Sequence, residues 1–461
     1  MKKFSFSKIP LEYYFLVIGL YFGLQLVFTN PPWHTNDEDR HFYNAWRFAH
    51  GQFKPTVENK KSGYMIPPKL YNQARSSQGI RFDEKTKINK NTFDVQKRVK
   101  YNARDAEYHK IPLINKLPVG FIPHIIGIKI GEVFKKNPLT VHWWARSFGL
   151  FTFLLIVFFA IKTIPVFKNV MMLVALAPMS LYQASSVTYD MLCNATTFLI
   201  IAYVVKWIYQ ENSISRKDLL LFFGAFLILI FSKSGYYVVP FLALMVPSQK
   251  FGFSYPKIKL ILILVFITFI PDLTWQQYIK SLHLPGSGAF QNDFAFGLKK
   301  SIMYHLQDIP TLISNLALNV LSQGKDWIIG CIGRFGYSYI PLPNVWIFAY
   351  VIILFVIAAI DHNVDFKLTL SQRGISALIM LASVGALLAA FYFSFTPIGA
   401  KAIFGAQGRY FIPILPLILL QVIGTVSISG KKYLSLATVL ISIVFLYQTI
   451  SFLDETFYHA N

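Results

Sequence analysis

Long apolar runs constrain this chain more than any other feature of its sequence. A helix needs about 20 mostly apolar residues to cross the hydrocarbon core of a bilayer. Such runs recur from near the start of the chain, at 11–28, to near its end, at 434–452. Only 14% of the 461 residues are charged, compared with about 25% in a soluble domain. These patterns predict an all-α, polytopic integral membrane protein.

About eleven segments are apolar enough to be expected as transmembrane helices, although the shorter ones are less regular in composition. They are 11–28, 143–164, 170–189, 191–209, 219–231, 236–246, 260–274, 345–360, 375–395, 410–428 and 434–452. Two long segments separate them, 29–142 and 275–344, and each contains an amphipathic piece, at 119–134 and 312–329. We expect large outer loops there, with helices lying at the membrane interface. An N-terminal module over 1–274 and a C-terminal part over 275–461 are expected to form one integrated membrane domain.

The net charge of +22 follows the expected topology. With a cytoplasmic N-terminus, Lys and Arg gather in the connections on the cytoplasmic side, as the positive-inside rule requires. Topology therefore explains the excess charge, and no nucleic-acid partner is expected. The basic stretch within 29–142 can attract anionic headgroups of membrane lipids. No small-residue cleavage site follows the first apolar run, so we interpret it as an uncleaved span in a bacterial plasma membrane.

The densest group of ionisable residues follows the first span, where three carboxylates and two histidines fall within 34–41. Charged groups beside a bilayer lose hydration and are kept only where something compensates for the loss. A carboxylate here can act as a general base. The structural alternative is a helix N-terminus that Asn36 or Asp37 caps. We predict a catalytic role for Asp37 first and Glu38 next, with His41 in support.

Asp190 is a second acidic candidate, because it lies between two apolar runs at an expected membrane boundary. Such a residue is a functional candidate by default, and the alternative is a helix cap in a tight turn. It can orient His41, hold a divalent cation or position an acceptor, and the sequence leaves these roles open. The histidines are spaced too irregularly to indicate a zinc site, and we name no metal and no cofactor, although a divalent cation stays open. Cys193 and Cys331 form no disulfide framework.

Several cations near the outer ends of spans are candidates to bind a substrate phosphate. A guanidinium suits bidentate contact with phosphate, whereas the alternative is snorkelling to lipid headgroups. The candidates are Arg409 with Gln407 before it, Arg146 and Lys233.

Five motifs occur in a particular order along the chain. They are Pro31-Pro32 with Asp37-Glu38-x-x-His41, Gln183 to Asp190, Lys233 to Tyr237, Gly333 to Pro343, and Gly405 to Pro413. Over nearly the whole chain this set resembles the bacterial membrane proteins of domain-of-unknown-function family 2142, which is similar to the GT-C glycosyltransferases that use polyprenyl-phosphate sugars. The resemblance implies a catalytic acidic residue in the first outer loop, matched by Asp37 or Glu38. It implies a second acidic residue at the outer end of the third span, matched by Asp190.

The function expected from these features is that of an inverting GT-C hexosyltransferase with an extracytoplasmic active site. It would move a sugar from a polyprenyl-phosphate donor to an envelope polysaccharide. One alternative is a transporter or flippase of lipid-linked saccharides, which calls for polar residues at mid-membrane depth and two related halves. Another is a polymerase or ligase of preassembled chains, for which arginines and histidines would matter more than Asp37.

Overall fold

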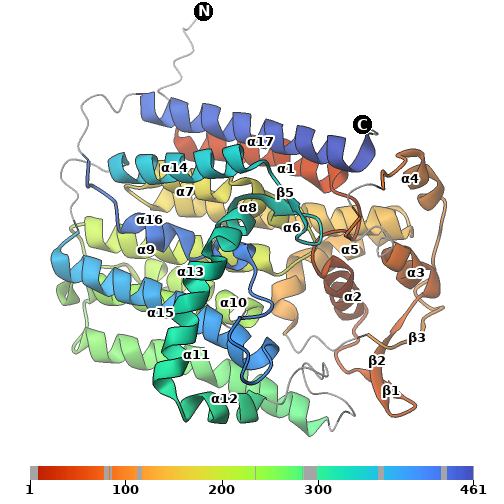
Figure 1. The fold of residues 1–461 in the computed structure, drawn as a ribbon, viewed down its shortest axis with the longest axis horizontal. Helices are drawn as coiled ribbons and strands as arrows, with labels where there is room; N and C mark the ends of the chain where they lie inside the picture. The colour runs from red at the N-terminus through yellow and green to blue at the C-terminus, as the bar shows by residue number, and fades with distance from the viewer. Residues whose placement is uncertain are drawn as a thin grey trace, which may run out of the picture.

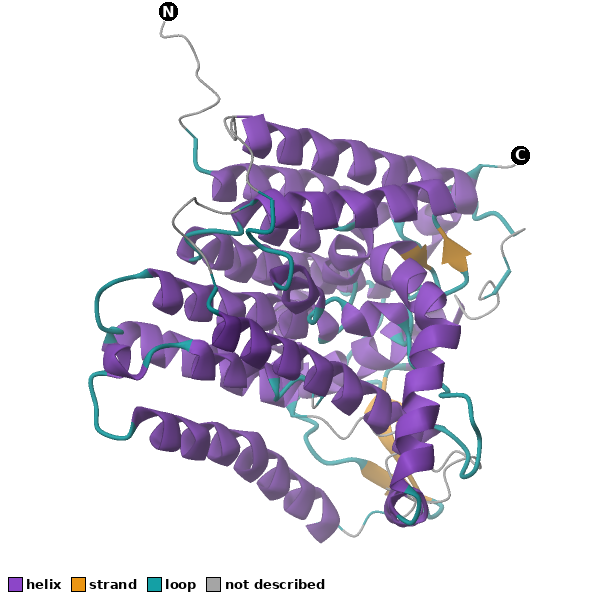
Figure 2. Cartoon of the chain, turned by 60° about the vertical axis from the view of Figure 1, so that its left-hand side comes forward, coloured by secondary structure: helices purple, strands orange, loops and turns teal. Residues whose placement is uncertain are grey.

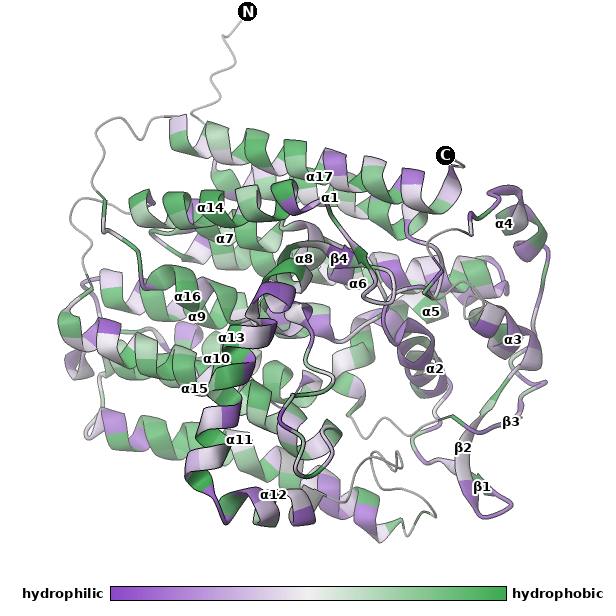
Figure 3. Ribbon diagram, viewed as in Figure 1, coloured by the Kyte–Doolittle hydropathy of each residue, from purple (hydrophilic) through white to green (hydrophobic). Residues whose placement is uncertain are grey.

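The computed structural model describes residues 9–76, 82–83, 86–111, 117–233, 235–282, 284, 298–361, 368–426 and 433–459. Within these ranges the chain is mostly helical. The axes of most helices lie roughly along one common line (Figure 1). Apolar residues follow the length of these helices, while hydrophilic residues gather in the connections and in the segment after the first helix (Figure 3).

Six described helices are long and apolar enough to cross a membrane. They are α1 (Leu11–Thr29), α6 (Pro138–Thr163), α9 (Asp190–Tyr209), α11 (Pro256–Ser281), α15 (Leu370–Phe395) and α17 (Leu434–Tyr458). The shorter α14 (Asn344–Ile360) is also apolar. Figure 1 shows α1, α14, α15 and α17 with their axes in roughly the same direction, as helices of one bilayer-spanning bundle have. The prediction of a helical, multi-pass membrane protein is confirmed, with six such helices among the described residues where about eleven spans were expected.

Some apolar segments that were expected to be spans form shorter elements. The span expected over 170–189 is replaced by two short, buried helices, α7 (Lys168–Ala175) and α8 (Pro178–Ala184). Pro178 has no N–H to continue the first helix, so the chain breaks there. The other short elements are η4 (Val239–Met245), η6 (Gly408–Phe411) and α16 (Leu415–Leu420), while 219–231 lies within α10 (Arg216–Ser232). An apolar run therefore predicts that a segment is buried, but it does not tell whether lipid or the rest of the protein covers it.

The first long connection forms a small layer at the end of the bundle where α1 ends (Figure 1). It contains a three-stranded antiparallel sheet in the order β1-β2-β3, with Thr56 opposite Gly63 and Tyr64 opposite His109. Its elements are α2 (Glu38–Ala49), β1 (Thr56–Glu58), β2 (Lys61–Ile66), α3 (Pro68–Ser76), α4 (Asn91–Gln96), β3 (Glu107–His109), η3 (Pro118–Phe121) and α5 (Ile122–Phe134). The helix expected over 119–134 is thus η3 followed by α5, and it packs against α6 and α2.

The second long connection contains α13 (Ile309–Gly333), which covers the amphipathic piece expected at 312–329. This helix runs across the direction of the bundle rather than along it (Figure 1), and the turned view of Figure 2 shows it beside the ends of other helices. It packs against η6. Before α13 in the chain comes α12 (Leu298–Leu306), and after it come β4 (Arg334–Phe335) and β5 (Ile340–Pro341). The short helix η5 (Ser248–Phe251) precedes α11.

One buried apolar cluster extends from Leu11 in α1 to Phe457 in α17, so both ends of the chain contribute to the same core. A second cluster, with Trp33, Trp46 and Phe121, holds the layer after α1. The long connection after α1 therefore has a packed interior of its own, which can fix the positions of polar side chains at its boundary with the bundle.

Candidate functional site

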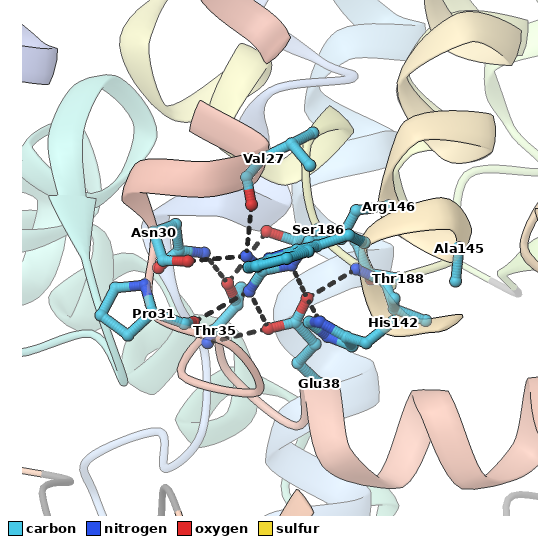
Figure 4. A network of polar contacts seen from close by, with 12 residues as sticks. Val27, Asn30, Pro31, Thr35, Glu38, His142, Ala145, Arg146, Ser186 and Thr188 are labelled. Carbon is cyan, nitrogen blue, oxygen red and sulfur yellow. Dashed lines mark hydrogen bonds and ion pairs between the residues drawn. The ribbon is translucent and has the colours of Figure 1, made fainter. Parts of the chain in front are cut away.

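Glu38 and Arg146 form a buried, bidentate ion pair where α2 begins (Figure 4). Arg146 Nε donates to Glu38 Oε1 at 2.7 Å and Nη2 donates to Oε2 at 2.6 Å, and neither side chain is exposed. Burial alone would raise the pKa of Glu38, but the charges of Arg146 and His142 outweigh it and hold that pKa well below its usual range. Glu38 is therefore ionised, and its charge is matched at close range.

Arg146 uses all five of its N–H groups inside the protein. Besides Glu38, it donates to the carbonyl oxygens of Val27 at 2.9 Å, Asn30 at 2.7 Å and Pro31 at 2.9 Å. These carbonyls belong to the last turn of α1 and the residues after it, which have no partner within the helix. Arg146 was expected to face a substrate phosphate, but in this structure it has no donor left to offer one. Its place in the fold is to tie α1, α2 and α6 together.

Glu38 has a similar role, because both of its carboxylate oxygens are occupied. The backbone N–H of Val187 donates to Oε1 at 2.9 Å, and His142 Nε2 lies 3.2 Å from the same oxygen. The N–H of Thr35 is 3.4 Å from Oε2. Of the two neighbouring carboxylates predicted as the base, Glu38 is thus the one that anchors the turn between α1 and α2 (Figure 4).

Asp37 differs from its neighbour, since its side chain is 39% exposed. It is the N-cap residue of α2, but its side chain makes no capping hydrogen bond. Its backbone is left-handed, with φ 57°, a conformation uncommon outside glycine but enriched in Asp. Oδ1 instead accepts a hydrogen bond from the Tyr337 hydroxyl at 3.1 Å and lies 3.6 Å from Arg40 Nη1. The capping alternative therefore does not describe this carboxylate.

The charges around Asp37 keep it ionised. Burial would raise its pKa, but the charges of Arg409 and Arg40, the Tyr337 hydrogen bond and the charge that His41 gains in acid together lower it. Asp37 is therefore in the deprotonated form that a general base needs at neutral pH.

His41 lies one helical turn after Asp37, on the same face of α2. Its ring is buried, stands edge-on to Tyr189 with 4.7 Å between centroids, and has an Nδ1 atom without a hydrogen-bond partner in the described structure. Burial lowers the pKa of His41 to about 4, although the carboxylates of Asp37 and Asp190 oppose the shift. His41 is therefore neutral at pH 7.

We expect His41 to make the protein sensitive to mild acid. In the unfolded chain its pKa is about 6.5, so below that pH the unfolded state binds the proton that the folded state excludes. The free energy of unfolding of the wild type should fall from pH 7 to pH 5 by roughly 2 kcal/mol more than that of His41→Gln. Denaturant unfolding in detergent at both pH values measures the difference. His459→Gln, at an exposed histidine, is the control, and equal pH slopes in wild type and His41→Gln would contradict the prediction.

Asp190 begins α9 and is held by cations rather than by a capping bond. Its Oδ1 accepts a hydrogen bond from Lys233 Nζ at 2.8 Å, and its Oδ2 accepts one from Gln183 Nε2 at 3.3 Å. Arg409 Nη1 lies 4.0 Å from the same Oδ2 atom. Lys233 Nζ also lies 3.8 Å from the ring centroid of Tyr410, a cation–π contact. Asp190 thus holds Lys233 and lies close to Arg409, whose charge also acts on the Asp37 carboxylate.

Arg409 is buried, at 4% exposure, but is incompletely hydrogen-bonded. Nη2 donates to the Tyr410 hydroxyl at 3.1 Å, whereas Nε and Nη1 have no hydrogen-bond partner among the described residues. Leaving buried donors unpaired costs about 1–3 kcal/mol, and more when they are charged. Such a group is explained by a ligand that supplies the missing acceptors.

A pocket of about 180 Å³ adjoins Arg409. One side is formed by the residues around η6 and the other by α13. Its lining consists of Met179, Gln323, Asp326, Trp327, Gly330, Arg334, Ser338, Ala406, Gln407, Gly408 and Arg409. The pocket adjoins the Asp37 turn, because Asn36 Nδ2 donates to Gln407 Oε1 at 3.0 Å and also to Ser338 Oγ.

The structure brings together most of the residues singled out from the sequence. One group is centred on Arg409 and its pocket, and its other members are Asp37, His41, Asp190, Lys233 and Gln407. Glu38 is next to Asp37 in the chain, but Glu38 and Arg146 are buried in their own ion pair where α1, α2 and α6 meet. Sequence reasoning assigned no role to Tyr337 or Ser338, or to the α13 residues that line the pocket. The signal for the latter was the spacing of Gln323, Asp326, Trp327 and Gly330, which places them on one helical face.

Within the described ranges, no group of three or more His, Cys, Asp or Glu residues could hold a metal ion. Asp190, considered as a cation ligand, has its oxygens against Lys233 and Gln183 instead. The site as described therefore combines two carboxylates, two cations and several amide and hydroxyl groups.

The wall of the pocket depends on a glycine. A Cβ atom on Gly408 would lie 2.1 Å from the carbonyl oxygen of Trp327 and 2.5 Å from the backbone N of Cys331. We expect Gly408→Ala to push η6 off α13, lowering the free energy of unfolding by about 1–3 kcal/mol and displacing Arg409. Thermal unfolding in detergent tests this. Gly385→Ala, in α15 with no atom near its added Cβ, is the control and should leave stability unchanged or slightly higher.

The fold and this group of residues define a polytopic membrane protein with a polar, charged site where the long connection after α1 meets the bundle. The chain matches the family model described as "Predicted membrane protein (DUF2142)" over residues 20–418, and it belongs to that family. No curated protein and no solved structure matches it.

Proposed function

We propose that this protein is a GT-C-type glycosyltransferase that moves a sugar from a polyprenyl-phosphate donor to an envelope polysaccharide. The reaction would take place at the outer face of a bacterial plasma membrane, with the N-terminus in the cytoplasm. The observation that carries the proposal is the pairing of an exposed, ionised carboxylate, Asp37, with a buried guanidinium, Arg409, that still has unpaired donors.

The two groups suit the two ends of a glycosyl transfer. The acceptor hydroxyl oxygen forms a bond to the anomeric carbon while the bond from that carbon to the phosphate oxygen breaks. Asp37 takes the hydroxyl proton, and the electron pair leaves with the phosphate, whose charge Arg409 stabilises. A single displacement of this kind inverts the anomeric centre.

The surrounding residues support these two roles. Asp190 holds Lys233 at 2.8 Å and stands 4.0 Å from Arg409, so it fixes both cations that would face the phosphate. Gln407 is held by Asn36, the residue before Asp37. His41 is neutral at pH 7 and lies one helical turn from Asp37, so it would act through Asp37 as a positioning residue.

Comparison of envelope glycans tests the proposal. Wild type, a gene deletion and the deletion complemented with the wild-type gene are grown alike, and the polysaccharide sugars are quantified. We expect the deletion to lose one sugar while the polymer backbone persists, and complementation to restore it. Loss or shortening of the whole polymer would instead favour transport or polymerisation of lipid-linked saccharides, and an unchanged glycan would remove the proposal.

A further inference from the structure

The pocket beside Arg409 is polar on the side formed by α13. Gln323, Asp326, Trp327 and Gly330 occupy positions i, i+3, i+4 and i+7 of this helix, so they share one face. Gly330 is in backbone contact with Gly408 and closes the wall there. The side chains of Gln323, Asp326 and Trp327 line the pocket and can contact a bound group there.

Two charged residues of the pocket lining, Arg409 and Asp326, differ in exposure. Arg409 is almost completely buried and offers positive charge with unpaired donors. Asp326 has a side chain that is 65% exposed and carries a negative charge, which Arg334 pairs at 2.9 Å. Because Arg334 also lines the pocket, the Asp326–Arg334 pair adds no net charge but still offers carboxylate oxygens. The lining fits a ligand with an anionic group for Arg409 and hydroxyl groups for Asp326, because hydroxyls donate well to carboxylates.

Gln323 is oriented to accept a hydrogen bond. Its Nε2 donates to Asn319 Oδ1 at 2.6 Å and to the carbonyl oxygen of Ile403 at 3.2 Å, which uses both amide N–H groups. Its Oε1 atom is left as an acceptor. Trp327 is fixed as well, because its Nε1 donates to the carbonyl oxygen of Ala406 at 3.2 Å and its ring stacks on Phe411.

The volume of about 180 Å³ limits what can enter. Sites for drug-sized ligands measure about 300–1,000 Å³, so the part of a ligand that sits inside this smaller pocket is about the size of one monosaccharide. We propose that it binds the sugar-phosphate head group of the donor. Arg409 contacts the phosphate, and Gln323 and Asp326 accept hydrogen bonds from the sugar hydroxyls and so select the sugar. This inference rests on the proposed function and deepens it by naming the residues that read the donor.

Binding measurements on the full chain in nanodiscs test the assignment. The probes are polyprenyl phosphate alone and polyprenyl phosphate carrying glucose, galactose, mannose or arabinose. We expect one glycolipid to bind at least tenfold more tightly than the bare lipid phosphate. Asp326→Asn and Gln323→Ala should reduce this preference to less than threefold and leave the Kd of the bare lipid unchanged. Arg409→Gln should weaken binding of both lipids at least tenfold.

Two further variants separate selection from damage. Arg334→Gln breaks the ion pair of Asp326 but keeps its carboxylate, so it should keep most of the sugar preference. Asp94→Asn changes an exposed carboxylate on α4 and should change nothing. Equal binding of bare and sugar-bearing lipids, with Arg409→Gln weakening both, would overturn sugar selection and leave the proposed function standing.

Two other results would be equally clear. Binding that does not depend on Arg409 would overturn the placement of the head group in this pocket. A sugar preference that depends on Asp326, in a protein whose deletion leaves the envelope glycan unchanged, would support the pocket and remove the transferase. Failure of the pocket assignment and failure of the proposed function therefore give different results.

Discussion

Replacing Glu38 with Gln is expected to lower the free energy of unfolding by about 3–5 kcal/mol, the usual cost of removing one partner of a buried ion pair. Arg146 would keep its full charge in a position with no exposure. The neutral amide also has one acceptor oxygen where the carboxylate has two, and those two oxygens now serve Arg146, Val187 and Thr35. We expect loose packing between α1, α2 and α6, and a low yield of folded protein.

Unfolding in detergent and resistance to limited proteolysis measure this effect. The matched control is Asp94→Asn, which breaks an exposed ion pair with Lys97 and should cost no more than about 1 kcal/mol. The double variant Glu38→Leu with Arg146→Met removes both charges and should recover part of the lost stability, since apolar residues can replace a buried pair. Normal stability of Glu38→Gln combined with lost activity would mean that Glu38, and not Asp37, is the catalytic carboxylate.

Asp37→Asn is expected to slow sugar transfer by about 10²–10⁴-fold, the usual contribution of a general base. Asn has nearly the same shape, also tolerates the left-handed backbone of this position, and can still accept the Tyr337 hydrogen bond at 3.1 Å. It cannot take a proton from an acceptor hydroxyl. Stability should therefore stay within about 1 kcal/mol of the wild type, as for most exposed substitutions.

Single-turnover transfer from a polyprenyl-phosphate sugar measures the rate, and a melting curve of the same sample reports the fold. The change should appear in kcat with little change in KM, because Asp37 acts in the transition state. Since its neighbours lower the pKa of Asp37, the wild-type rate should not fall on the acid side until well below neutral pH. An Asp37→Asn protein that is folded and fully active would show that this carboxylate serves only the backbone of the turn.

The sequence was sufficient to predict the class of fold. Continuous apolar runs such as those of α1, α6 and α17 can only be satisfied by lipid or by a large core, and their lengths match a bilayer. It was not sufficient to separate spans from buried pieces. The apolar run at 170–189 became two short helices because of one proline, and hydropathy does not register that break.

The sequence also located the candidate site, through acidic residues placed where apolar neighbours leave them little hydration. Asp37 and Glu38 are adjacent, however, and nothing in their order tells which one is exposed. The exposure of Asp37 and the burial of Glu38 depend on the left-handed backbone at Asp37 and on Arg146. Arg146 lies 108 residues beyond Glu38 in the chain and forms the buried ion pair with it. Arg146 and Arg409 likewise looked alike as cations near span ends. Only the tertiary structure distinguishes the saturated guanidinium from the one with unpaired donors, because hydrogen-bond partners come from segments far apart in the chain.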